Sequence, residues 1–220
     1  LPELGVRIFR FGPNGEVRLS INIPEAIVNR HETCGIAETS DGSVVVTAYH
    51  EQRASVFRFD ATGRVEWQRR FENTRLSSPV VVPGPGGQVV IAGSELVESD
   101  GHNMWIASFD REGELLWNRR LSGDRTCFTA VDGFRTGSGD IALVGGLCVG
   151  SVLVTLSPDG QLPIEDCDHF THASLEVSEI DVETISASYH NEEGFLVETP
   201  YELVTLPTVA STSNLCDHER

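Results

Sequence analysis

Lysine is absent from this sequence, and methionine occurs only once. All 16 cationic side chains are arginine, and they stand against 33 aspartate and glutamate residues, which gives a formal net charge of −17. Without lysine the chain has neither a Schiff-base nucleophile nor the lysine of a phosphate-binding loop. So acidic a surface repels both nucleic acid and anionic membranes. We therefore expect no nucleic-acid partner.

The sequence also has no long apolar run and no apolar leader at its start. No run approaches the roughly 18 residues that a membrane-spanning helix needs, so we expect no membrane insertion. The chain starts at Leu1 without an initiator methionine, which predicts a processed product or an excised piece. Its five cysteines are compatible with an oxidising compartment, and we expect an extracytoplasmic or secreted protein.

Turn dipeptides that end in glycine recur at an almost constant interval. The four turn glycines, 48, 50 and 47 residues apart, are Gly15, Gly63, Gly113 and Gly160. A large apolar residue precedes each glycine by four positions, at Phe11, Phe59, Phe109 and Leu156. The residues four positions after each glycine are Leu19, Trp67, Trp117 and Ile164. This spacing predicts a β-hairpin with one buried face, so one structural unit is repeated.

A second glycine turn and a β-rich run precede each hairpin. These turns contain Gly42, Gly87, Gly139 and Gly194. Together with a weaker run upstream, each unit holds four short strands in about 48 residues. That period is typical of a β-propeller blade, because a twisted four-stranded sheet buries both faces only when neighbours stack on it. We predict an all-β fold, a β-propeller of four-stranded antiparallel blades, with four to five blades present or a segment of a larger ring.

The repeat divides the chain into units of one propeller domain, residues 1–220. Residues 1–24 form a partial blade, residues 30–73, 76–124 and 127–168 form full blades, and residues 183–207 form an incomplete last blade. Either the ends join into a ring of four or five blades, or the remaining blades lie on another chain. The run Glu202–Leu206 duplicates an outer strand that the first residues already supply, which favours the second interpretation.

Two segments carry a resemblance to a known family. FDATGRVEW at Phe59–Trp67 and FDREGELLW at Phe109–Trp117 resemble the blade-closing motif of bacterial quinoprotein-like (PQQ-like) β-propeller repeats. The resemblance implies a propeller fold. No position matches a cofactor-binding residue of that family, so we expect no cofactor. Fold alone does not define a function.

The cysteines allow two disulfides. Cys127 and Cys148 are equally far from the turn Thr136–Gly139, so they lie opposite each other across an antiparallel pair. Two buried thiols are the alternative. Cys167 and Cys216 each stand in a Cys-Asp-His triplet, and a bridge between them would hold the C-terminal region.

A polar cluster near the fourth unit offers weak metal candidates, Asp168, His169 and His172. Zinc accepts such ligands, but usually from a helix turn or a knuckle. On an extended segment His169 and His172 point to opposite faces, because their separation is odd. A solvated loop explains the cluster, and we assign no metal.

Two kinds of repeated dipeptide are candidate interaction residues. Tyr49-His50 and Tyr189-His190 end two units, and on one rim they would form a polar aromatic binding surface; shared repeat ancestry explains them equally well. Arg69-Arg70 and Arg119-Arg120 follow the two motif tryptophans. One arginine of each pair faces the neighbouring blade on an alternating strand, and we expect ion pairs with carboxylates there.

These observations favour a non-catalytic propeller that presents rim loops to a protein or glycan partner, because loops on rigid scaffolds are where binding resides. One alternative is a hydrolase or lyase with an acid and a base at the mouth of a central channel. Another is a subunit that completes a larger ring with a second chain.

Overall fold

The structure is a computed structural model of the 220-residue chain. It describes residues 6–23, 26–27, 35–50, 53–72, 76–97, 101–122, 128–147, 150–162, 170–171, 176–181 and 185–186. These residues contain 17 strands, one three-residue 3-10 turn, η1 (Pro85–Gly87), and no α-helix. The prediction of an all-β fold is confirmed. No helix among the described residues is long and apolar enough to cross a membrane.

The strands form four antiparallel sheets, which we number I to IV in chain order. Sheet I orders β1 (Val6–Phe11), β2 (Val17–Ile23) and β17 (Ile185–Ser186). Sheet II orders β16 (Val177–Glu179), β7 (Val65–Phe71), β6 (Arg53–Phe59), β5 (Val44–His50) and β3 (Ala26–Ile27), with β4 (Ile36–Glu38) also paired to β5. Sheet III orders β15 (Phe170–Thr171), β11 (Leu115–Leu121), β10 (Gly101–Phe109), β9 (Val89–Val97) and β8 (Leu76–Pro83). Sheet IV orders β12 (Thr129–Arg135), β13 (Ile141–Leu147) and β14 (Gly150–Leu156).

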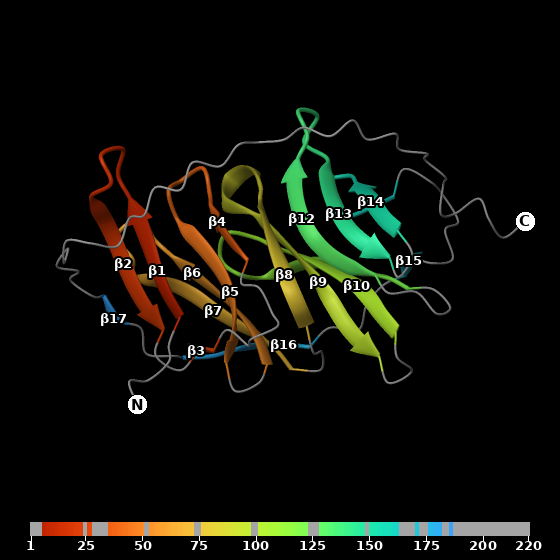
Figure 1. The fold of residues 1–220 in the computed structure, drawn as a ribbon, viewed down its shortest axis with the longest axis horizontal. Helices are drawn as coiled ribbons and strands as arrows, with labels where there is room; N and C mark the ends of the chain where they lie inside the picture. Colours follow the sequence, from red (N-terminus) through yellow and green to blue (C-terminus); the bar gives the residue numbers. More distant parts are fainter. Residues whose placement is uncertain are drawn as a thin grey trace, which may run out of the picture.

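The sheets stack in sequence along the longest axis of the molecule, with sheet I and sheet IV at opposite ends (Figure 1). Three apolar layers lie between successive sheets. Alternation along one strand supplies two layers at once: in β6, Phe57 packs toward sheet I, whereas Val56 packs toward sheet III. Sheets II and III are therefore covered on both faces, which explains their nearly continuous apolar strands.

The glycine turns of the described residues lie at one edge of the stack, which we call the turn rim (residues 12–16, 39–43, 60–64, 84–88, 110–114, 136–140 and 157–161). Six of these turns share two backbone bonds, as in the turn of residues 110–114, where Asp110 N–H donates to Glu114 O and Gly113 N–H donates to Asp110 O. The glycine adopts a positive φ, +83° at Gly113, which side chains other than glycine adopt only with strain. The opposite strand ends form the connection rim.

After sheet IV the chain returns along the stack in reverse order. We call residues 170–186 the return segment. Its short strands add to the last strand of three sheets: β15 pairs with β11, β16 with β7 and β17 with β2. The sheets consequently hold three, six, five and three strands, whereas four were predicted for each full blade and a partial blade for residues 1–24. The additional strands come from the return segment, which adds one strand to each of sheets I to III, and from β3, which pairs with β5 in sheet II.

The predicted incomplete last unit, residues 183–207, is represented among the described residues only by Ile185–Ser186. These two residues pair with Asn22 and Ile21 of sheet I. The remainder of that unit, from residue 187 onward, lies outside the described residues.

Candidate interaction rim

Tyr49 and His50 end β5 at the connection rim. In the register of sheet II, Tyr49 lies opposite Ala54, and His50 lies opposite Arg53. Their side chains are outside the described part of the structure, as are both residues of the second predicted dipeptide, Tyr189 and His190. The metal candidates and the disulfide candidates also lie outside the described residues: Asp168, His169, His172, Cys127, Cys148, Cys167 and Cys216.

A carboxylate held by three side chains occupies the connection rim of sheet II. Arg53 donates from Nη1 to the Glu72 carboxylate and, at 2.7 Å, to the Glu72 backbone oxygen. Arg70 Nε lies 3.0 Å from Glu72 Oε1, and the Ser178 hydroxyl donates to the same oxygen. The Ser178 hydrogen bond, together with the two arginines, lowers the pKa of Glu72. Glu72 is therefore anionic near neutral pH, and the 46% exposed side chain of Arg53 keeps donors available to a ligand.

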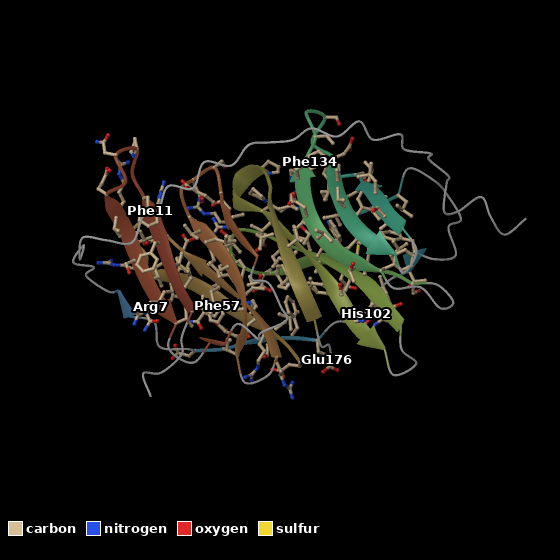
Figure 2. All side chains as sticks on the ribbon, in the orientation of Figure 1. Arg7, Phe11, Phe57, His102, Phe134 and Glu176 are labelled. Carbon is tan, nitrogen blue, oxygen red and sulfur yellow. The ribbon has the colours of Figure 1, made fainter. Side chains whose placement is uncertain are left out.

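Sheet III places a second pair at the same rim. Arg120 contacts Glu95 in a two-point arrangement, Nε to Oε2 at 2.8 Å and Nη2 to Oε1 at 2.9 Å. Glu95 keeps 14% of its side chain exposed, so the pair is partly desolvated. His102 is the second residue of the adjacent strand, β10, and its backbone oxygen accepts a hydrogen bond from Phe128 N–H at 2.7 Å. Figure 2 shows His102 at the same edge of the molecule as Glu176, which precedes β16.

Two buried polar atoms of β10 have no hydrogen-bond partner among the described residues, Trp105 Nε1 and His102 Nδ1. Trp105 is in the middle of the strand and 1% exposed, and its ring meets Phe71 edge-on at 4.7 Å between sheets II and III. A buried donor without a partner costs roughly 1–3 kcal/mol. Of the two residues, only His102 lies at the rim.

The tryptophans of the two motifs lie between successive sheets and contact the turn of the next sheet. The Trp67 indole lies against Gly113 of the next sheet, and its Nε1 donates to Arg111 O at 2.8 Å. Arg69, two residues later on the same face, donates from Nε to Gly113 O at 3.0 Å. The next interface repeats these contacts with Trp117 and Arg119 against Gly160. Leu19 takes the corresponding place against Gly63.

The arginine dipeptides contact both the neighbouring sheet and their own sheet. Arg69 lies 3.5 Å from Glu114 of the neighbouring sheet, as predicted. Arg119 donates to Gly160 O of the neighbouring sheet, while Arg70 and Arg120 pair with glutamates of their own sheets. The strand pleat explains the division: the first arginine of each dipeptide faces the next sheet beside its tryptophan, and the second faces the other way.

Sequence reasoning did not find Arg58 at the turn rim, the most buried charged side chain among the described residues. Its guanidinium is 0% exposed and donates to Asp41 Oδ2 at 2.9 Å and to Glu66 Oε2 at 2.6 Å. A third bond reaches Gly87 O of sheet III at 2.6 Å. A hydrogen bond from Thr39, helped by Ser43 and Arg58, lowers the pKa of Asp41 to about 2. This cluster has its hydrogen-bonding groups satisfied and serves to lock two sheets together.

The chemistry available at the connection rim is hydrogen bonding by guanidinium and carboxylate groups. No group of three or more histidine, cysteine, aspartate or glutamate side chains within the described ranges could hold a metal ion. The sequence signal that could have found Glu72 and Glu95 is their position near a strand end beside arginine-bearing strands, but acidic residues are too frequent here for that signal to be specific.

Comparison with known proteins adds little to this description. Neither a protein-family model nor a curated protein matches the sequence. Among solved structures, the chain is similar to one named as a candidate exo-beta-1,3-galactanase from Bifidobacterium bifidum s17, with a TM-score of 0.44 and 13% sequence identity. The likeness covers 74% of this chain and 57% of that one, so the chain spans little more than half of that structure. At this TM-score the likeness assigns neither a family nor a function.

Proposed function

We propose that this chain is a non-catalytic β-propeller module that binds a glycan or protein partner through its connection rim. Each sheet is a blade in this proposal, and the tryptophan motifs are the blade-closing contacts of quinoprotein-like repeats. The ordered stacking of four sheets, joined by the same contact at three interfaces, supports the propeller. An extracytoplasmic location is part of the proposal and rests on the cysteine content.

The observation that carries the rim proposal is the pair of arginine–glutamate clusters at the ends of two rigid sheets. Arg53 with Glu72 and Arg120 with Glu95 present charged, planar groups that are only partly solvated. A two-point donor or acceptor of this kind matches the vicinal hydroxyls of a sugar or the side chains of a polar protein surface. Because sheets II and III are covered on both faces, these groups are positioned before a ligand arrives.

Affinity gel electrophoresis with neutral and acidic polysaccharides tests the glycan part directly. The full chain is compared with the rim variants Arg53→Ala and Arg120→Ala, and with Arg64→Ala, an exposed arginine of the turn rim, as the matched control. We expect at least one polysaccharide to retard the wild type. The rim variants should weaken that retention about tenfold, which corresponds to roughly 1.4 kcal/mol, while the control should leave it unchanged.

Two results would contradict this proposal. Retention that the rim variants leave intact would place the glycan elsewhere on the protein. Release of reducing or unsaturated ends from a retained polysaccharide would show catalysis and would favour the hydrolase or lyase alternative. If no polysaccharide retards the chain, the glycan part is wrong, and a protein is the partner class to be tested at the same rim.

A further inference from the structure

Each end of the stack has a sheet face that no other sheet of the described residues covers. Sheet I packs on sheet II with one face, and sheet IV packs on sheet III with one face. The free face of sheet I corresponds to the faces of sheets II, III and IV that pack on the preceding sheet. The free face of sheet IV corresponds to the faces of sheets I, II and III that pack on the following sheet. We call them the receiving face and the donating face.

The receiving face contains the two positions that each later sheet uses to contact the sheet before it: the turn glycine and the large apolar residue four positions before it. No described residue packs on either position in sheet I. The residue four positions before the turn glycine is 0% exposed in sheets II, III and IV, at Phe59, Phe109 and Leu156. In sheet I the same position is Phe11, which is 55% exposed. The turn glycines of the later sheets lie against Leu19, Trp67 and Trp117, whereas a Cβ on Gly15 would meet nothing within 4 Å.

The donating face shows the same contrast. The residue seven positions before the turn glycine is Ile8, Val56 or Ile106 in sheets I to III, and each of these is at most 5% exposed. In sheet IV this position is Leu153, which is 64% exposed. Val144 lies directly opposite Leu153 and is 38% exposed, although its counterparts Thr47 and Ala92 are buried.

The register of sheet IV extends the donating face across all three strands. Phe134 on β12 is 53% exposed and lies opposite Ala142, on the same face as Val144. Asp132, opposite Val144, gives this face a negative charge. The receiving face carries Arg7 and Arg18 on the side of sheet I opposite the buried layer; Arg18 pairs with Glu16 at 2.8 Å, and Arg7 supplies positive charge. The two faces are therefore complementary in apolar content and in charge.

We propose that the donating face of one copy packs on the receiving face of a second copy of this chain. Within one chain the two faces lie at opposite ends of the stack, so they do not meet each other (Figure 1). Figure 2 shows Phe11 on sheet I and Phe134 on sheet IV, both toward the turn rim, as one interface type requires. A second copy supplies both missing halves at once.

Two chains that use both faces close a ring of eight sheets, within the range of known propellers. A head-to-tail contact of this kind closes only if the rotation per chain is a half-turn; otherwise it forms open chains. We infer the closed dimer. The interaction uses the end faces, not the connection rim, and so is independent of the rim proposal above.

The test is the mass of the full chain in solution, measured by sedimentation at micromolar concentration. About 0.15 M salt is needed, because the net charge of −17 on each copy opposes association and must be screened. We expect twice the chain mass of 24.0 kDa, constant over a concentration series. A particle of one chain overturns the proposal. A mass that keeps rising with concentration also overturns it, because the ring then does not close.

Three substitutions identify the faces. Phe11→Arg and Leu153→Arg each block one half of the interface and should reduce the mass to one chain. Leu116→Arg is the matched control, because Leu116 is 51% exposed and lies on neither end face. All three positions are more than half exposed, so the variants should keep the wild-type circular dichroism spectrum.

Mixing the two variants tests directly whether the donating face of one copy packs on the receiving face of the other. The Phe11→Arg copy still has an intact donating face, and the Leu153→Arg copy still has an intact receiving face. A 1:1 mixture should therefore recover a two-chain particle, held by one interface instead of two. If the mixture stays at one chain, if either variant alone remains a dimer, or if the control dissociates, the proposed pairing of unlike faces is wrong.

Discussion

Replacing Gly113 with alanine tests the contact that joins successive sheets. A Cβ at this position would lie 2.7 Å from Cδ2 of Trp67, 2.9 Å from Cγ and 3.0 Å from Cε2. The indole cannot easily move away, because Trp67 is 5% exposed, its Nε1 donates to Arg111 O, and its ring packs near Phe109. The new methyl group must therefore displace a packed ring.

Two energies contribute to the loss of stability. The φ of +83° at Gly113 costs alanine roughly 1–2 kcal/mol. Forcing a methyl group into a filled interface adds about 1–3 kcal/mol. We expect Gly113→Ala to lower the free energy of unfolding by about 2–5 kcal/mol. With an m-value near 2 kcal/mol/M, the urea midpoint falls by about 1–2.5 M.

Gly139→Ala separates the two energies. Gly139 has a similar φ of +91° and the same turn hydrogen bond, but a Cβ there meets nothing within 4 Å. This variant should lose only the conformational part, about 1–2 kcal/mol. Equal losses for Gly113→Ala and Gly139→Ala in urea unfolding would refute the sheet-joining role of the tryptophan.

A double substitution adds a second check on the same contact. Trp67→Leu removes the ring that the Gly113 methyl group strikes, at a cost of its own for the lost burial. In the Gly113→Ala background this cost should be smaller by about 1–3 kcal/mol, because the clash disappears with the ring. Strictly additive losses would show that the two residues do not act on each other.

Three further predictions concern charge and redox state. Arg58→Ala leaves two carboxylates and a carbonyl facing a buried void, and should cost about 3–5 kcal/mol in urea unfolding, whereas exposed Arg64→Ala should change stability by less than about 0.5 kcal/mol. Because the folded-state pKa of Asp41, about 2, lies below its ordinary value of 3.8, its contribution is complete above about pH 4 and is lost as the pH falls toward 2. Asp41→Asn should therefore flatten the decline of stability across that window, and an unchanged slope would contradict the assignment. If both predicted disulfides form, thiol titration of the unfolded, unreduced chain should find one free cysteine out of five, and a count of five excludes both bridges.

The repeat could be predicted from the sequence because it depends on local chemistry. The glycine turns need a positive φ, and the apolar residues around them must alternate to bury one face, so both leave a fixed period in the chain. The partners of Arg69 and Arg119 were harder to predict, because backbone carbonyls of the next sheet leave no mark in side-chain identity. The position of the tryptophans on the next turn glycine follows only when the stacking is known.

The return segment left no usable sequence signal. Its strands are two or three residues long, too short for a period of two to stand out, and their partners lie up to about 160 residues away in the chain. Distance along the chain also explains why one member of the rim clusters was missed. Ser178, which helps to hold Glu72, belongs to the return segment and comes near β7 only in the folded chain. Tyr49 and His50 were predicted at the end of a unit, and the backbone places them at the end of β5.

The return segment also has a consequence for synthesis on the ribosome. Sheets I to III can pair their own strands as soon as each hairpin emerges, because those contacts are local. Their outer edges wait for residues 170–186, which reach sheet III first and sheet I last. Sheet I, which is made before sheets II to IV, is thus the last of the three to have its edge covered, and its nascent strand edge stays open, a template for mispairing, until Ile185–Ser186 emerge.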